Sequence, residues 1–493
     1  MFSDKKNSLW LSFQFVAMLL ISLVTLKLNL LNFGTRQFGI WIMFASIWGF
    51  GSAIDFGFGT ALIKYVAEYN KYQKEELNNL LSTSFFVFFI AAFLLFGFGN
   101  LIAEVFFFAD VNIVKGDEVY LFRKVFLILG FAFVIQYMTI FYKSTLEGLN
   151  NFVLTSKIIM FYNFGVLLGV IVVTLLTANI IYLSLVYLVS RFITFLIYFI
   201  MMKKRYGSLK INLRSFNFAS IKNILGFSLS AQFISVFSAL IDPAIKYIIG
   251  TYFQVSFVSS YEIAKRFAAA ISGLFFAAFK IVLPKVSVLK SKDDYKNFVL
   301  GEGLKFTKIG LAYSGLVFGI FAFVIVFIIN WWFNAPESII VFLMLALPES
   351  INNVGFTNYT FLIGIGKAHI IALVQFFNVA IISSFLILGF VLFNNIFGLL
   401  GYFFTVVIVN LFILLYIKRL IGFSIYTYLK KIKAYKLLLL LIMLLIGPIV
   451  LYQNIWSISL TLGLLSVFSF FIFANDLKQY SGVFVKYLMG KND

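Results

Sequence analysis

Charged residues inside apolar runs are the features of this sequence that could do chemistry. The segment SALIDPAIKYIIG (238–250) places Asp242, Pro243 and Lys246 in an otherwise apolar stretch. A charge at mid-bilayer costs about 3 kcal/mol on insertion scales, so such groups normally face a bundle interior or a wet cavity. Ten charged residues lie inside long apolar runs: Lys27, Asp55, Arg191, Asp242, Lys246, Glu262, Lys265, Arg266, Lys280 and Glu349.

The spacing of these residues predicts ion pairs along single helices. Asp242 and Lys246 are four residues apart, as are Glu262 and Arg266, and Glu262 is three residues from Lys265. Side chains at these spacings share one helical face and can neutralise each other. Asp55 and Glu349 have no opposite charge within four residues, and burial of a carboxylate favours its protonated form. Proton coupling through these two carboxylates is therefore a second hypothesis, beside pairing across helices.

The residue types that are rare in the sequence exclude several kinds of site. The sequence has no cysteine, which excludes disulfides, thiolate catalysis and cysteine-ligated metal. Its one histidine, His369, lies in the turn GIGKAH and is interpreted as an interfacial residue. We therefore predict no catalytic residue, no metal site and no cofactor.

The composition requires a membrane to surround most of the chain. Of 493 residues, 62% are hydrophobic and 12% charged, whereas a soluble domain needs roughly a quarter charged. All the apolar runs but the shortest, 437–452, reach the length of about 18 residues that a spanning helix needs, and none alternates like a barrel strand. We predict an all-α polytopic membrane protein with fourteen transmembrane helices. The runs fall at 8–32, 38–63, 79–104, 121–141, 156–177, 180–202, 223–249, 255–284, 307–330, 338–363, 368–393, 397–417, 437–452 and 455–474.

Basic residues predict the orientation and the domain plan. Most of the 39 Lys and Arg residues fall on one side if both termini are cytoplasmic. The strongest basic runs are interpreted as topology anchors that contact anionic lipid head groups, and no nucleic acid is expected as a partner. These runs divide the chain into a six-helix lobe, a linker, a second six-helix lobe and a tail with helices 13 and 14: 1–202, 203–222, 223–417 and 418–493.

The distribution of the ten charges favours a transporter. Eight lie in the first, second, seventh and eighth runs, which are the first two of each six-helix half. A two-repeat transporter with one site between its halves would give this pattern. These eight comprise five cations and three anions, so pairing leaves an excess of positive charge that suits an anionic ligand.

Several motifs resemble the polysaccharide flippase branch of the multidrug/oligosaccharidyl-lipid/polysaccharide (MOP) exporter superfamily, the Wzx-type O-antigen translocases. The motifs are FGTRQFGIWIMFASIWGFGSAIDFGFGTALIKYVAEY (33–69), EGLNNF (147–152), IDPAIKYIIG (241–250) and SSYEIAKRFAAAISGLFFAAFKIVLPKVS (259–287). The resemblance implies two six-helix lobes in a V around a central cavity lined by helices 1, 2, 7 and 8.

The resemblance also implies a substrate. Related proteins move undecaprenyl-diphosphate-linked saccharides, such as the O-antigen units of lipopolysaccharide, across the plasma (inner) membrane. By this resemblance, Lys27, Lys246, Lys265 and Arg266 would face the diphosphate, and other membrane proteins of polysaccharide assembly are candidate partners. The remaining charges would line the cavity or couple ions: Asp55, Asp242, Glu262, Glu349, Arg191 and Lys280.

Two alternatives stay open at this point. A drug/cation antiporter of the same superfamily would prefer an acidic cavity for its cationic substrates. The excess of positive charge among the predicted residues argues against this alternative. A membrane polysaccharide polymerase or ligase generally needs a sizeable outer loop, and the longest one here is FFFADVNIVKGDEVYL (105–120). The expected function is therefore a flippase that works by alternating access, and not an enzyme.

Overall fold

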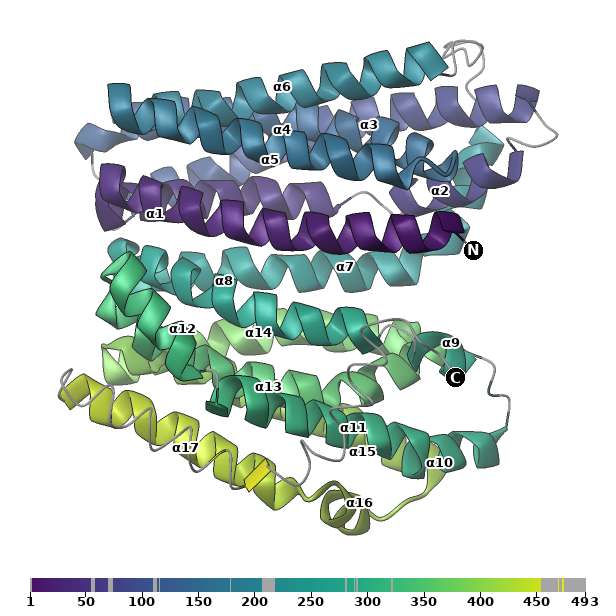
Figure 1. Ribbon diagram of the computed structural model, residues 1–493, viewed down its shortest axis with the longest axis vertical. Helices are drawn as coiled ribbons and strands as arrows, with labels where there is room; N and C mark the ends of the chain where they lie inside the picture. Colours follow the sequence, from purple (N-terminus) through teal and green to yellow (C-terminus); the bar gives the residue numbers. More distant parts are fainter. Residues whose placement is uncertain are drawn as a thin grey trace. The chain divides into compact units, whose positions relative to one another are not determined.

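The computed structural model describes most of the chain, and every regular element in that part is a helix (Figure 1). The chain divides into two compact units, Met1–Ser259 and Ser260–Asp493, with the boundary inside α8 (Val255–Ala278). In the part described, ten helices are long and apolar enough to cross a membrane. The described residues are 2–54, 58–69, 74–109, 113–114, 116–177, 179–205, 218–279, 282–287, 289, 291–320, 322–453, 469 and 472–473.

The first unit is built around α4. This helix packs against α6, α3, α2 and α1, and its buried face is rich in phenylalanine. Trp48 donates from its indole Nε1 to the Phe126 carbonyl at 3.3 Å, and a Cβ at Gly99 or Gly130 would collide with its ring. The elements of this unit are α1 (Phe2–Ala53), α2 (Phe58–Tyr69), α3 (Lys74–Ala103), η1 (Glu104–Phe108), η2 (Gly116–Glu118), α4 (Val119–Gly148), α5 (Phe152–Leu176), α6 (Ile180–Arg205) and α7 (Phe218–Tyr252).

The long element α1 contains two helices joined at Gly34. This glycine has φ 66° and ψ 175°, a backbone conformation that only glycine adopts without strain. The turn is held by Ser259, whose hydroxyl donates to the Thr35 carbonyl at 2.7 Å. Nearby, Arg36 forms a 3.0 Å ion pair with Glu118. One glycine therefore joins the helices of the predicted spans 8–32 and 38–63.

The second of these spans is not one continuous helix. The glycines of the motif WGFGSAIDFGFG (48–59) allow either close helix packing or local unwinding, and the sequence favours close packing. In the structure α1 ends at Ala53, Ile54 lies outside helix, and α2 begins at Phe58. Tyr137 of α4, which is 1% exposed, donates its hydroxyl to the Ile54 carbonyl at 2.5 Å. In a membrane, a carbonyl outside a helix needs such a protein donor because lipid offers none.

Replacing Tyr137 by phenylalanine should therefore destabilise the protein by about 1–3 kcal/mol, because it leaves the part-buried Ile54 carbonyl without this donor. Thermal denaturation of the purified protein in detergent measures the effect. Tyr142→Phe is the matched control, since Tyr142 is also buried in α4 and its hydroxyl has no hydrogen bond among the described residues. Equal losses in the two variants would contradict the assigned role of Tyr137.

The second unit is built around α13, which packs against α11, α15 and α17. A Cβ at Gly315 or Gly319 would collide with Phe473 or Ser469, so the end of the described chain lies directly against η5. Lys436 donates from Nζ to the Ile472 carbonyl at 2.7 Å. Beyond α8, the elements are α9 (Val282–Ser287), α10 (Lys292–Leu300), α11 (Glu302–Ser314), η5 (Gly315–Ile320), α12 (Ala322–Ile328), η6 (Ile329–Phe333), α13 (Pro336–Gly364), α14 (Ala368–Phe393), η7 (Ile396–Leu399), α15 (Leu400–Ile421), α16 (Ile425–Ile432) and α17 (Ala434–Gln453).

The all-α membrane fold is confirmed. Within the described residues, the predicted apolar runs up to residue 452 lie on helices, except that Ile54 interrupts the run 38–63 and the π-helical turn η5 divides the run 307–330. The last run, 455–474, and the centre of the predicted linker, 206–217, lie mostly or wholly outside the described residues.

Candidate functional site

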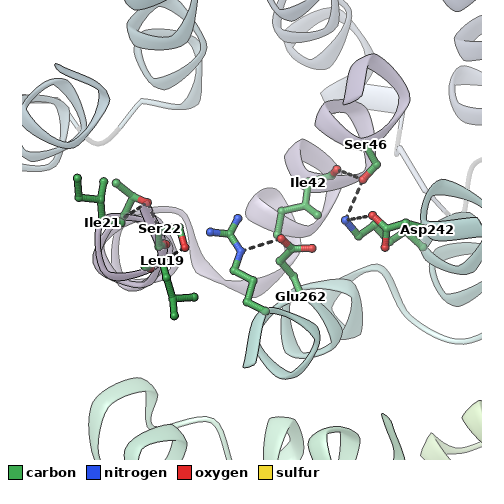
Figure 2. Close-up of polar contacts among 10 residues, drawn as sticks. Leu19, Ile21, Ser22, Ile42, Ser46, Asp242 and Glu262 are labelled. Atoms are coloured by element: carbon green, nitrogen blue, oxygen red, sulfur yellow. Dashed lines mark hydrogen bonds and ion pairs between the residues drawn. The ribbon is translucent and has the colours of Figure 1, made fainter. Parts of the chain in front are cut away.

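In the first unit, an ion pair on α7 is tied to the second half of α1. Lys246 Nζ lies 2.8 Å from Asp242 Oδ2 and donates to Ser46 Oγ at 3.0 Å, as the dashed contacts to Ser46 and Asp242 in Figure 2 show. The Ser46 hydroxyl in turn donates to the Ile42 carbonyl at 2.6 Å, which leaves its oxygen lone pairs to accept from the lysine. The i, i+4 pair predicted from spacing is present.

Exposure differs sharply within this pair. The side chain of Lys246 is 6% exposed, whereas that of Asp242 is 28% exposed. The amine is thus enclosed by α7 and α1, and the carboxylate is the more accessible partner. Lys246 therefore joins two helices of the first unit in addition to carrying charge.

The other predicted charges of the first unit lie apart from this pair. Lys27, on the first half of α1, is half-buried and forms no hydrogen bond or ion pair within the described part of the chain. Arg191 of α6 stacks its guanidinium 3.9 Å from the centre of the Tyr162 ring on α5. Asp55 lies outside the described residues. Of the predicted residues that the structure describes in this unit, only Asp242 and Lys246 are brought together.

In the second unit, α8 and α13 form a second charged cluster. Arg266 donates from Nε to Glu262 Oε1 at 2.8 Å, a contact also drawn in Figure 2. The Arg266 side chain is 28% exposed and that of Glu262 12%. Glu349 of α13 is enclosed beside Ser272 and close enough to Lys265 for their charges to interact.

Lys265 itself is half-buried, with its amine 5.8 Å from the Tyr261 ring centre one turn earlier. The second unit therefore brings together four predicted residues, namely Glu262, Lys265, Arg266 and Glu349. Lys280 lies outside the described residues. This cluster combines two cations and two carboxylates, with an arginine that is partly accessible.

Sequence reasoning missed the neutral partners of these charges. Ser46, Ser272 and Tyr162 each lie on a different helix from the charge that they contact or approach. Serine in a membrane helix usually bonds to its own backbone, as Ser46 also does, so its identity alone gave no signal. In the described part of the chain, no three His, Asp or Glu side chains lie close enough to hold a metal ion.

The fold resembles solved transporters of the MOP superfamily. The lipid II flippase MurJ in an inward closed conformation aligns at 18% identity over 97% of this chain and 99% of its own, with a TM-score of 0.62. A multidrug resistance MATE family transporter in an inward-facing conformation aligns at 15% identity over 83% of this chain and 96% of its own, with a TM-score of 0.58. A MOP superfamily transporter from Pyrococcus furiosus Vc1 (DSM3638) aligns at 16% identity over 84% and 96%, with a TM-score of 0.54.

At such low identities these alignments show the fold alone, which this chain shares with transporters of the MOP superfamily. No curated protein matches the sequence significantly. A family model described as polysaccharide biosynthesis protein matches residues 33–309, which is more than half of the chain. The chain is therefore a multi-pass membrane protein that belongs to the polysaccharide biosynthesis protein family.

Proposed function

We propose that this protein is a flippase that moves an undecaprenyl-diphosphate-linked oligosaccharide, an O-antigen or capsule type of repeat unit, across the plasma membrane. The observation that carries the proposal is the partly accessible Arg266 beside Lys265 on α8. An arginine fork matches phosphate geometry and a lysine adds a point charge, so together they suit a diphosphate. The family and the MurJ-like fold support this substrate class.

Five of the ten predicted charged residues have a proposed role in binding the substrate. Arg266 and Lys265 contact the diphosphate, and Glu262 orients the guanidinium when the site is empty. Lys27, which has no partner among the described residues, supplies further positive charge, and Lys246 supplies charge while joining α7 to α1. The proposed lobes are residues 1–202 and 223–417, with 203–222 as a cytoplasmic linker and both termini cytoplasmic. The lobes move by alternating access, and no covalent chemistry is required.

The test is transport by the purified protein in proteoliposomes. We expect a fluorescent undecaprenyl-diphosphate oligosaccharide to cross the bilayer at least tenfold faster with the protein than without it. A polyprenol lacking the diphosphate is the control substrate and should not cross faster. Transport of a lipophilic cation in place of the saccharide would overturn the proposal and favour a drug/cation antiporter.

Repeating the assay with and without a proton gradient, using Glu349→Gln, tests proton coupling through that carboxylate.

A further inference from the structure

The connection between α15 and α17 forms a short helix, α16, with two distinct faces. Ser424 caps its start by accepting a hydrogen bond from the Thr427 backbone N–H, and Lys433 ends it in a left-handed conformation, φ 59°. Tyr428 and Ile432 are buried, whereas Tyr426 is 76% exposed. One face of α16 is therefore packed on the second unit, and the other is open.

The buried face fixes α16 in place. The Tyr428 hydroxyl donates to Asn358 Oδ1 of α13 at 3.3 Å and lies 3.3 Å from the Thr307 hydroxyl of α11. Its ring lies 5.4 Å from that of Phe423. Contacts with two other helices hold α16 in a defined orientation. The side chains on its open face are therefore fixed in their position on the protein surface.

The open face is cationic. The exposed cations of this face and of the adjoining end of α15, which we call the α16 basic surface, are Lys418, Arg419, Lys430, Lys431 and Lys433. The sequence contains no acidic residue between Glu349 and Asp476, so no carboxylate of that stretch can neutralise them. A ligand of this surface should therefore be anionic.

Exposed apolar and aromatic side chains lie beside these cations. Tyr426, Leu429, Tyr435 and Leu438 are 76%, 36%, 59% and 60% exposed. The flanking helices are apolar, and α15 is long enough to cross the membrane. Tyrosines and long basic side chains next to the end of a spanning helix are typical of the membrane–water interface, where each has an apolar body and a polar tip.

We propose that the α16 basic surface binds the head groups of anionic phospholipids in the adjacent leaflet, while Tyr426 and Leu429 enter the interfacial layer. The combination of cations with exposed apolar groups favours a lipid surface over a soluble anionic partner, which would leave the apolar groups in water. This binding holds the ends of α15 and α17 at one membrane interface. It does not depend on which substrate the protein transports.

The absence of cysteine gives a direct test. Tyr426→Cys in the full-length protein provides the single thiol for a fluorophore, and the labelled protein is placed in phosphatidylcholine nanodiscs. Quenching is then compared between quencher-labelled phosphatidylglycerol and quencher-labelled phosphatidylcholine. We expect stronger quenching by phosphatidylglycerol, and Lys430→Gln with Lys431→Gln should reduce this preference by about fivefold for each cation removed, the equivalent of about 1 kcal/mol each.

The matched control is Lys292→Gln with Lys296→Gln, which changes the net charge equally on α10, where Asp293 and Asp294 lie alongside. This control should keep the preference for phosphatidylglycerol. Equal quenching by the two lipids in the parent protein would overturn the proposal. An equal loss in the control variant would also overturn it, because net charge rather than this surface would then attract the lipid.

Discussion

Replacing Arg266 by alanine should reduce saccharide transport about 100-fold while the protein still accumulates in the membrane. Arg266 is partly exposed, and a guanidinium has enough donors to bond both Glu262 and a phosphate. Loss of a hydrogen-bonded charge contact costs about 2–5 kcal/mol, and 2.7 kcal/mol corresponds to 100-fold. Arg266→Lys should keep part of the activity, because it retains charge but not the bidentate geometry.

Restoration of the surface polysaccharide in cells that lack their own transporter measures this effect, normalised to the amount of protein in the membrane. Arg123→Ala is the matched control, since it removes an arginine from another membrane helix, α4, where the guanidinium pairs with Glu104 at 2.7 Å. This control should transport normally per molecule. Normal transport by Arg266→Ala at normal abundance would remove α8 from the proposed diphosphate site.

Replacing Lys246 by methionine should destabilise the protein by about 3–5 kcal/mol. The amine is enclosed between Asp242 and Ser46, so the variant leaves a partly buried carboxylate without its cation. Thermal denaturation in detergent measures the loss. Combining Lys246→Met with Asp242→Asn should restore most of the stability, because the second change removes the unpaired charge.

The double variant also separates stability from transport. If Lys246 only joins helices, the double variant should transport normally once it accumulates normally. If Lys246 also supplies charge to the substrate, transport should stay low in the stable double variant. Full stability of the single Lys246→Met variant would show that the pair does not hold α7 against α1.

The lengths of the apolar runs were sufficient to predict the helices, and the spacing of opposite charges was sufficient to predict two ion pairs. Asp242–Lys246 and Glu262–Arg266 follow from i, i+4 positions on one helix, and both pairs are present. The fold class follows from apolar runs that only a membrane can accommodate. These features depend on residues close in sequence, and local geometry alone determines them.

Partners from other helices could not be predicted in this way. Nothing in the sequence around Ser46 or Tyr162 shows that these residues lie beside a charge. Only the packing of the helices brings Lys246 and Arg191 next to them. The break after Ala53 was only the less favoured of two predictions, because a run of apolar residues and glycines is compatible with both a closely packed helix and an interrupted one. The structure shows an interrupted helix, in which the Ile54 carbonyl accepts a hydrogen bond from the hydroxyl of Tyr137 on another helix.

The packing of Ser469 and Phe473 against η5 has a consequence for the order in which the second unit assembles. Ribosomes synthesise these residues after every other described part of the second unit. Until they emerge, the glycine face of η5 lacks Phe473 and Ser469, and the Lys436 amine lacks its bond to the Ile472 carbonyl. The first unit can assemble while translation continues, as domains generally do from the N-terminus. The second unit therefore reaches its final packing only when Ser469, Ile472 and Phe473 have met η5 and Lys436.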